Sequence, residues 1–536
     1  MKHLTTFILG LVFALCVSAQ DYTPRHRYRV SLKDKKGSVY STKHPEQFLS
    51  PKAIERRKRQ KLKIDKTDLP VSQVYLDALR KDGVKVIICS KWNNTVVVET
   101  TDTTLMDKVR QESFVTDVRK VAVYTKDDTP DPKARFAYIK TEKEPEVKSE
   151  PEVATSESTE DKVNRIVEAQ LSEMVSTLFP GQSDLDSLST EQKDSINILR
   201  DFMKKEVRSY LNSITENQTL DDVVVTNTEE TKPFNYYGEG WGQLHMMNVD
   251  VLHDKGYKGK GMTIAVIDGG FLNADIIPML KNVNVLGYKD FVNPGIDNVF
   301  EQEQHGTMVL STIGANQPGV FVGTAPEASF WLLRSEDGHS EQMVEEDTWC
   351  AAIEFADSVG ADVVNTSLGY TKFDNEADNV LYHELDGRTR IISRSASMAA
   401  DKGMVLCQSA GNSAGYDTWK LIGVPADADN ILTVGAVNED RVNTIFSSIG
   451  HSADGRIKPD VCAQGGDCTV IARNGKLSQA DGTSFSSPIM CGSVTCFWQA
   501  NPKLTAKQVI SAIRALGDNA EHPDQVFGYG IPDFSK

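Results

Sequence analysis

The chain has 536 residues, of which 40% are hydrophobic and 25% charged, and its formal net charge is −16. This length allows about three domains. The acidic balance argues against nucleic acid as a partner, because phosphate binding requires a basic face. Beyond the N-terminal segment, no stretch approaches about 18 continuous apolar residues, so we expect no transmembrane helix in the mature chain.

The N-terminus has the pattern of a secretory signal peptide. Lys2 gives a positive start, an apolar run covers residues 4–17, and small residues at 17–19 precede polar Gln20 and Asp21. The run is too short to span a bilayer, and the alternative is an N-terminal core helix. We therefore expect residues 1–20 to be removed and the protein to be exported to the periplasm, the cell surface or the extracellular medium.

Residues 21–125 are predicted to form a small α/β unit. Strand-like segments lie at 28–32, 84–88, 95–99 and 118–123. Ser50 and Pro51 open a helix, a second helix runs over 72–81 and stops at Gly83, and Asp102 can cap a third. We interpret the basic run 56–59 in the first helix as a solvated face. Apart from that extra helix, the order is β-α-β-β-α-β, a ferredoxin-like arrangement.

Residues 126–234 form an acidic insertion. Positions 126–230 carry 24 acidic and 13 basic residues, and hence most of the negative charge of the chain. The first part, 126–161, is rich in Glu, Pro, Ser and Thr and is predicted to be disordered. Apolar residues at helical spacing over 163–178 and 196–214 predict two amphipathic helices. We interpret them as a pair that packs on itself, and the role of the insertion stays open.

Residues 235–536 are predicted to form a parallel sheet with helices on both faces. Continuous apolar strands at 262–267, 362–365, 404–406 and 431–434 alternate with helical segments, as in such sheets. Ligands and catalytic groups in sheets of this kind lie at the carboxyl ends of the strands. The residues that follow each strand are therefore the candidates for a functional site.

Four polar residues follow predicted strands or turns in this region. Asp268 ends an apolar strand, His305 stands in Glu-Gln-His-Gly-Thr, and Ser484 opens a predicted helix within Gly-Thr-Ser-Phe-Ser-Ser-Pro. Each alone is more often structural: a cap, a core histidine or an N-cap serine. Together they supply an orienting carboxylate, a base and a nucleophile. Asn412, after another strand and a glycine, adds an amide donor suited to an oxyanion.

With these motifs in this order, the chain from about 260 to 535 resembles the subtilisin-like serine proteases, in the style of secreted members from Bacteroidetes-type bacteria. The resemblance implies an α/β fold, with a three-layer catalytic domain around a parallel sheet. It implies that Asp268 orients His305, that His305 is the general base, and that Ser484 is the nucleophile. Asn412 and the Ser484 backbone N–H would form the oxyanion hole. The substrate-binding walls would be Ser367, Leu368 and Gly369 on one side and Ser409, Ala410 and Gly411 on the other.

The resemblance also gives the α/β unit at 21–125 a meaning, because subtilase propeptides have a ferredoxin-like fold and act as intramolecular chaperone and inhibitor. We therefore expect a self-processed zymogen of an endopeptidase. Its partners would be protein or peptide substrates and its own propeptide, and the mature form would be a monomer. The alternative is a catalytically silent protein of the same fold that serves in binding or adhesion.

Departures from the family pattern affect positions outside the chemistry: Met308, Gly270 and Phe485 replace the residues that many members carry. We expect no required cofactor and assign no metal ligand, although family members often bind structural calcium. Among the cysteines, Cys462 and Cys468 bracket a glycine-rich loop and could close a small bridge. Cys491 and Cys496 lie on diverging faces of one predicted helix and are not expected to pair.

Overall fold

The computed structural model describes residues 23–125, 235–295, 298–415 and 419–536. The signal peptide expected at 1–20, and the disorder and helices expected between 126 and 234, lie outside the described residues. Within the described ranges, no helix combines the length and apolarity needed to cross a membrane. The domain boundaries given above stay predictions.

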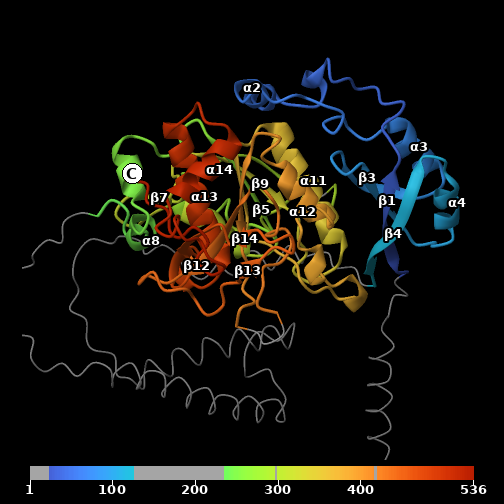
Figure 1. Ribbon diagram of the computed structural model, residues 1–536. Coiled ribbons are helices and arrows are strands. Elements are labelled where there is room, and N and C mark those ends of the chain that lie inside the picture. Colours follow the sequence, from blue (N-terminus) through green and yellow to red (C-terminus); the bar gives the residue numbers. More distant parts are fainter. Residues whose placement is uncertain (1–22, 126–234, 296–297, 416–418) are drawn as a thin grey trace, which may run out of the picture. The chain divides into compact units, whose positions relative to one another are not determined.

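The N-terminal unit has the predicted β-α-β-β-α-β order. Its strands pair in the order β2-β3-β1-β4, with antiparallel neighbours, and pack with α3 and α4 around a small apolar core (blue in Figure 1). The elements are β1 (Arg25–Leu32), η1 (Pro45–Gln47), α2 (Pro51–Arg59), α3 (Gln73–Lys81), β2 (Lys85–Ser90), β3 (Thr95–Thr100), α4 (Leu105–Gln111) and β4 (Val115–Tyr124).

The extra basic helix α2 begins as predicted, and its basic run is exposed at Lys58 and Arg59 but not at the two residues before them. The Ser50 hydroxyl accepts a hydrogen bond from the Ala53 N–H at 3.1 Å and so caps the helix. The prediction that its basic run is solvated was wrong for Arg56 and Arg57, which are 2% and 1% exposed. Both guanidinium groups pair with the buried Asp357, which lies some 300 positions along the chain. Buried charges persist when they are paired in this way.

The large sheet has seven strands in the order β15-β12-β11-β10-β5-β9-β6, and all neighbouring pairs are parallel. The four strands predicted from apolar runs are confirmed as β5, β10, β11 and β12. The strand bounds are β5 (Thr263–Asp268), β6 (Asn284–Asp290), β9 (Ser329–Arg334), β10 (Val363–Thr366), β11 (Val405–Ser409), β12 (Leu432–Val437) and β15 (Val461–Gln464).

Helices cover both faces of this sheet, which makes three layers. In Figure 1, α13 and α14 (red) lie on one side of β5 and β9, and α11 and α12 (yellow to orange) lie on the other. Successive side chains of a strand point to opposite faces. Accordingly, Ile264 and Val266 belong to one core and Ala265 and Ile267 to the other. The helices are α8 (Trp241–His245), α9 (Val249–Asp254), α10 (His305–Gly314), α11 (Val344–Val359), α12 (Ile391–Met398), α13 (Thr483–Ala500) and α14 (Ala506–Ala515).

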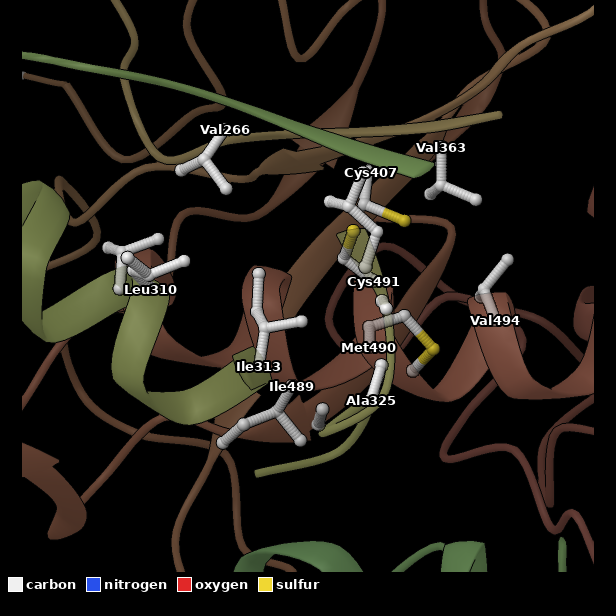
Figure 2. Close-up of a cluster of buried hydrophobic side chains, with 14 of the residues drawn as sticks. Val266, Leu310, Ile313, Ala325, Val363, Cys407, Ile489, Met490, Cys491 and Val494 are labelled. Carbon is white, nitrogen blue, oxygen red and sulfur yellow. The ribbon is translucent and has the colours of Figure 1, made fainter. Parts of the chain in front are cut away.

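The first of these cores fixes α10 and α13 under the sheet. Figure 2 shows Val266 of β5, Val363 of β10 and Cys407 of β11 facing side chains of α10 and α13. This packing holds the N-termini of α10 and α13 at the sheet edge where the strands end. The shorter elements are η3 (Pro278–Leu280), β7 (Asn316–Gln317), β8 (Phe321–Val322), η4 (Glu376–Asp378), η5 (Tyr382–Glu384), β13 (Gly450–His451), β14 (Ile457–Lys458), β16 (Cys468–Ile471) and β17 (Leu477–Ala480).

The cysteines in the described ranges are all free, and most are buried. The bridge that Cys462 and Cys468 could have formed is absent. The Cys462 thiol donates instead to the Phe527 carbonyl at 3.6 Å, and the Cys468 thiol donates to the Gln464 carbonyl at 3.4 Å. Cys491 and Cys496 do not pair either, as predicted.

Candidate active site

Asp268 and His305 meet at the carboxyl edge of the sheet. Asp268 ends β5 and is fully buried, and His305 is the first residue of α10. The Nδ1 atom of His305 lies 2.8 Å from Oδ1 of Asp268, which also accepts the Gly269 N–H at 2.8 Å. Gly306 makes this approach feasible, because a Cβ at that position would overlap the Gly270 carbonyl oxygen. The helix can therefore begin directly against the end of the strand.

Ser484 is the second residue of α13, as predicted. The helix is capped by Gly482, whose φ of 149° is disfavoured for other residues. Pro488 lacks an N–H and cannot donate to the Ser484 carbonyl one turn earlier. The Ser367 hydroxyl, after β10, donates to that carbonyl instead at 2.8 Å. This bond ties the start of the helix to the edge of the sheet.

The side chains of Asp268, His305 and Ser484 line one pocket of about 390 Å³. The Ser484 hydroxyl, however, donates to the Ser367 carbonyl oxygen at 3.3 Å. The His305 ring uses Nδ1 for Asp268, and within the described residues it makes no hydrogen bond to Ser484. The structure thus brings the three residues together without the serine–histidine bond.

The Asn412 amide is oriented by a threonine that the sequence analysis did not single out. Asn412 Oδ1 accepts hydrogen bonds from the backbone N–H and the hydroxyl of Thr483, each at 2.9 Å. The Thr483 hydroxyl oxygen accepts the Gly411 N–H at 3.1 Å. With its oxygen occupied, Asn412 has its Nδ2 donors left for another acceptor. The only sequence signal was the position of Thr483 beside Ser484 in the same motif.

The expected substrate-binding walls are only partly pocket walls. Ser367, Leu368 and Gly369 line the pocket, as do Ser409 and Gly411. Ala410 does not line it, because its side chain is 1% exposed and packs in the core under α11 and α12. The pocket residues missing from the sequence-based candidates include three acidic ones: Glu303, Glu336 and Glu341.

The pocket is strongly acidic, and this determines the protonation of its histidine. Burial by itself lowers the pKa of His305, but the Asp268 carboxylate, with Glu336 and Glu303, raises this pKa to about 9. Burial and the charge of Asp268 raise the pKa of Glu336 to about 7. Across the described ranges, no three His, Cys, Asp or Glu side chains are arranged to hold a metal ion.

Comparison with known protein families shows which family the chain belongs to. Residues 259–530, just over half of the chain, match the subtilase family, Peptidase S8. The chain belongs to the subtilase family. Residues 27–134 of this subtilase match the peptidase S8 propeptide domain of Bacteroidota. The protein is therefore a serine endopeptidase with an N-terminal propeptide domain, and the predicted resemblance is confirmed.

Individual relatives are similar to this subtilase at modest identity. Subtilisin DY of Bacillus licheniformis is 28% identical over 282 residues, which cover 52% of this chain and 90% of the relative. Subtilisin NAT of Bacillus subtilis subsp. natto is 27% identical over 334 residues, covering 60% and 79%. Among solved structures, MycP1 with its N-terminal propeptide removed has 24% identity and a TM-score of 0.45, covering 55% of this chain and 94% of that chain.

Proposed function

We propose that this subtilase hydrolyses peptide bonds through an acyl-enzyme on Ser484, with His305 as general base and Asp268 as its orienting carboxylate. The observation that carries the proposal is the 2.8 Å contact between His305 Nδ1 and Asp268 Oδ1 in the same pocket as Ser484. That contact leaves the other ring nitrogen, Nε2, to accept a proton. It also holds the imidazole in the tautomer that a base requires.

Formation of the acyl-enzyme begins when the Ser484 hydroxyl leaves the Ser367 carbonyl and turns to His305. The long 3.3 Å bond to Ser367 is a weak restraint, so rotation about the Cα–Cβ bond of Ser484 costs little. His305 takes the hydroxyl proton as the oxygen attacks the scissile carbonyl carbon. It then gives that proton to the leaving amine, and a water molecule repeats the sequence to release the acid.

The developing oxyanion is stabilised by two donors, Asn412 Nδ2 and the Ser484 backbone N–H. The Ser484 N–H belongs to the first turn of α13, where N–H groups have no partner within the helix. Thr483 supports the side-chain donor, because it occupies the Asn412 oxygen and turns the amide nitrogen outward. The substrate backbone is held as an added strand between Ser367–Gly369 and Ser409–Gly411.

The propeptide keeps the enzyme inactive until the enzyme removes it, and the protein is exported. The last strand of the N-terminal unit supports the inhibitory role of the propeptide. The Val123 N–H donates to Gln342 Oε1 at 2.7 Å, and Gln342 is the neighbour of the pocket residue Glu341. The segment that follows β4 in the sequence therefore begins close to the pocket.

A fluorophosphonate probe tests the catalytic proposal, because it labels only an activated serine. The wild-type protein and the neighbouring control Ser413→Ala should be labelled. Ser484→Ala should not be labelled, and His305→Ala should lose labelling because the serine has no base. Absence of labelling in the processed wild type, or equal labelling of Ser484→Ala, would favour the catalytically silent alternative.

N-terminal sequencing of the exported protein tests self-processing. Wild type should begin after the propeptide domain, whereas Ser484→Ala should retain the propeptide. If both proteins begin at the same residue, another protease performs the maturation. Recovery of the protein only from the cytoplasm, with residues 1–20 intact, would contradict export.

A further inference from the structure

The catalytic pocket has an acidic wall with no role in the proposed mechanism. Glu303, Glu336 and Glu341 line it together with Asp268 and His305, and no lysine or arginine is among the residues that line it. Carboxylates confined together repel one another and are costly to keep ionised away from water. An excess of negative charge in a substrate-sized pocket therefore calls for a positive charge from the ligand.

One glycine, Gly338, allows these carboxylates to converge. A Cβ on Gly338 would stand 2.5 Å from Glu303 Oε1 and 2.9 Å from its Cδ, so the Glu303 carboxylate lies directly on the Gly338 backbone. The absence of a side chain at Gly338 therefore brings Glu303 against the loop that carries Glu336 and Glu341.

Glu345, behind this wall, is buried without a cation or a side-chain partner. It is only 2% exposed, and no side chain among the described residues donates to its carboxylate, so only the backbone of Gln342 acts to stabilise its charge. The charges of Glu336, Glu341 and Asp337 act on this carboxylate, which places it within the same group. A buried polar group without a partner is uncommon and calls for an explanation.

The electrostatics of the wall agree with a missing cation. Burial, with the charges of Glu336 and Asp374, raises the pKa of Glu341 to about 8. Burial and its acidic neighbours raise the pKa of Glu345 well above the ordinary value. No cation among the described residues offsets these effects on either group. The Tyr370 hydroxyl, at 3.4 Å from Glu336 Oε2, gives that carboxylate a weak neutral donor.

We propose that this acidic wall, formed by Glu303, Glu336 and Glu341 with Glu345 behind them, binds a lysine or arginine side chain of the substrate close to the scissile bond. The inference rests on the proposed function, because it assigns a substrate class to the same pocket. An ammonium or guanidinium group supplies both the countercharge and the hydrogen-bond donors that the carboxylates lack. The residue that carries it lies beside Ser367–Gly369, which share the pocket.

The test uses the mature enzyme and a peptide series that differs at one position at a time. At each of the four positions before the cleaved bond, lysine, arginine, norleucine and glutamate are compared. At one position, kcat/KM should be about 10-fold or more higher for lysine or arginine than for norleucine, and lowest for glutamate. Norleucine matches the lysine stem, so the ratio isolates the charge.

Variants then assign the preference to the wall. Glu341→Gln should reduce the lysine-to-norleucine ratio, and Glu341→Gln with Glu345→Gln should bring it close to one. The matched surface variant Glu439→Gln, at an exposed loop position, should leave the ratio unchanged. A ratio that stays high in the double variant would overturn the assignment to these residues.

The outcomes separate this inference from the proposed function. An enzyme that labels with fluorophosphonate and cleaves all peptides with ratios near one would refute the cation-binding wall and leave the triad proposal standing. Failure to label and to cleave would refute both. Calcium binding to the Ser484→Ala protein that is lost with Glu341→Gln and Glu345→Gln, without a preference for basic peptides, would assign the wall to a metal and overturn the inference.

Discussion

Two groups of buried carboxylates differ in their partners: those at the contact between α11 and the propeptide unit, and those at the wall of the catalytic pocket. At the propeptide contact every carboxylate has a partner. Arg29 binds Asp347 through two hydrogen bonds at 2.6 and 2.7 Å. Glu354 accepts from the Ser90 hydroxyl and from the Lys91 N–H at 2.5 and 2.6 Å.

Asp357 is the clearest case on the propeptide side. It pairs with Arg56, Arg57 and Lys91, all from the propeptide unit. Burial by itself would raise the pKa of Asp357, but these cations lower it below its ordinary value. Behind the pocket wall, burial and like charges raise the pKa of Glu345, and no lysine or arginine is among the main causes that oppose them. Asp357 and Glu345, two carboxylates at similar burial on α11, thus have pKa values shifted in opposite directions.

The difference shows which buried carboxylates already have a countercharge within the chain. Asp347, Glu354 and Asp357 of α11 are satisfied within the chain by residues of the propeptide unit. Glu341 in the pocket and Glu345 behind it have no lysine or arginine as a countercharge among the described residues. Variants in the first region should change stability, and variants in the second should change catalysis and its pH dependence.

The largest effect is expected for Asp357→Asn in the intact Ser484→Ala chain. Removing this carboxylate leaves Arg56 buried without its paired counterion and Arg57 with Asp68 alone, so the free energy of unfolding should fall by about 3–5 kcal/mol. Chemical denaturation measures the change. The control Asp77→Asn removes the exposed pair with Arg80 and should cost at most about 1 kcal/mol. Equal effects of the two variants would show that the propeptide contact is not anchored by Asp357.

Asn412→Ala should have the opposite profile. Loss of the oxyanion donor should lower kcat by about 10²–10³-fold, the size known for the corresponding group of subtilisin. KM and the free energy of unfolding should change little, because Asn412 is exposed. Steady-state kinetics with a peptide substrate and a denaturation curve measure both. A loss of stability with normal kcat would place Asn412 outside the catalytic machinery.

Glu345→Gln should stabilise the chain, in contrast to Asp357→Asn. Because the pKa of Glu345 is raised on folding, the carboxylate costs stability above its unfolded pKa, and this cost disappears as the pH falls. In the Ser484→Ala background, the variant should be more stable by about 1–3 kcal/mol at pH 9 and nearly unchanged at pH 5. Destabilisation at pH 9 would mean that Glu345 has an unseen partner.

Asp357 gives the reverse dependence on pH in the same experiment. Its folded pKa lies below the ordinary value, so its contribution to stability is present above the unfolded pKa and is lost as the pH falls through the folded pKa. The stability difference between the parent chain and Asp357→Asn should therefore shrink in acid. The stability difference between the parent chain and Glu345→Gln should instead grow as the pH rises.

The smallest effect concerns the pH profile of catalysis. Only neutral His305 acts as a base, so kcat/KM should rise with pH and reach half of its plateau near pH 9. Glu336→Gln removes one of the charges that raise the pKa of His305, while the larger effect of Asp268 and the effect of Glu303 remain. The midpoint of the kcat/KM profile should therefore move down by up to about one pH unit. Glu341→Gln, whose charge is not among the main contributors, should shift it less. Identical profiles would exclude electrostatic coupling between Glu336 and His305.

The sequence predicted those site residues and secondary-structure elements that depend on a local sequence pattern. Asp268, His305, Ser484 and Asn412 were found because each stands in a short motif at the end of an apolar strand or the start of a helix. The β-α-β-β-α-β order and four strands of the large sheet followed from periodicity. The family then explained why these parts occur in one chain.

Properties that arise from tertiary contacts were not predictable from the sequence. The basic run of α2 is typical of a solvated face, and only folding brings Asp357 to Arg56 and Arg57. Glu336 and Glu345 were not singled out, since their proximity depends on how one loop folds against the pocket. The role of Thr483 and the hydrogen bond from Ser484 to Ser367 depend on side-chain rotamers, which no motif specifies.

A crystal structure of the mature enzyme with a peptide boronic acid bearing lysine would test the central claim most directly. We predict a covalent bond from Ser484 Oγ to boron, with the hydroxyl turned away from the Ser367 carbonyl, His305 Nε2 within hydrogen-bonding distance and Asn412 Nδ2 donating to the boronate oxygen. A boronate that leaves Ser484 unmodified and still bonded to the Ser367 carbonyl would contradict the serine mechanism.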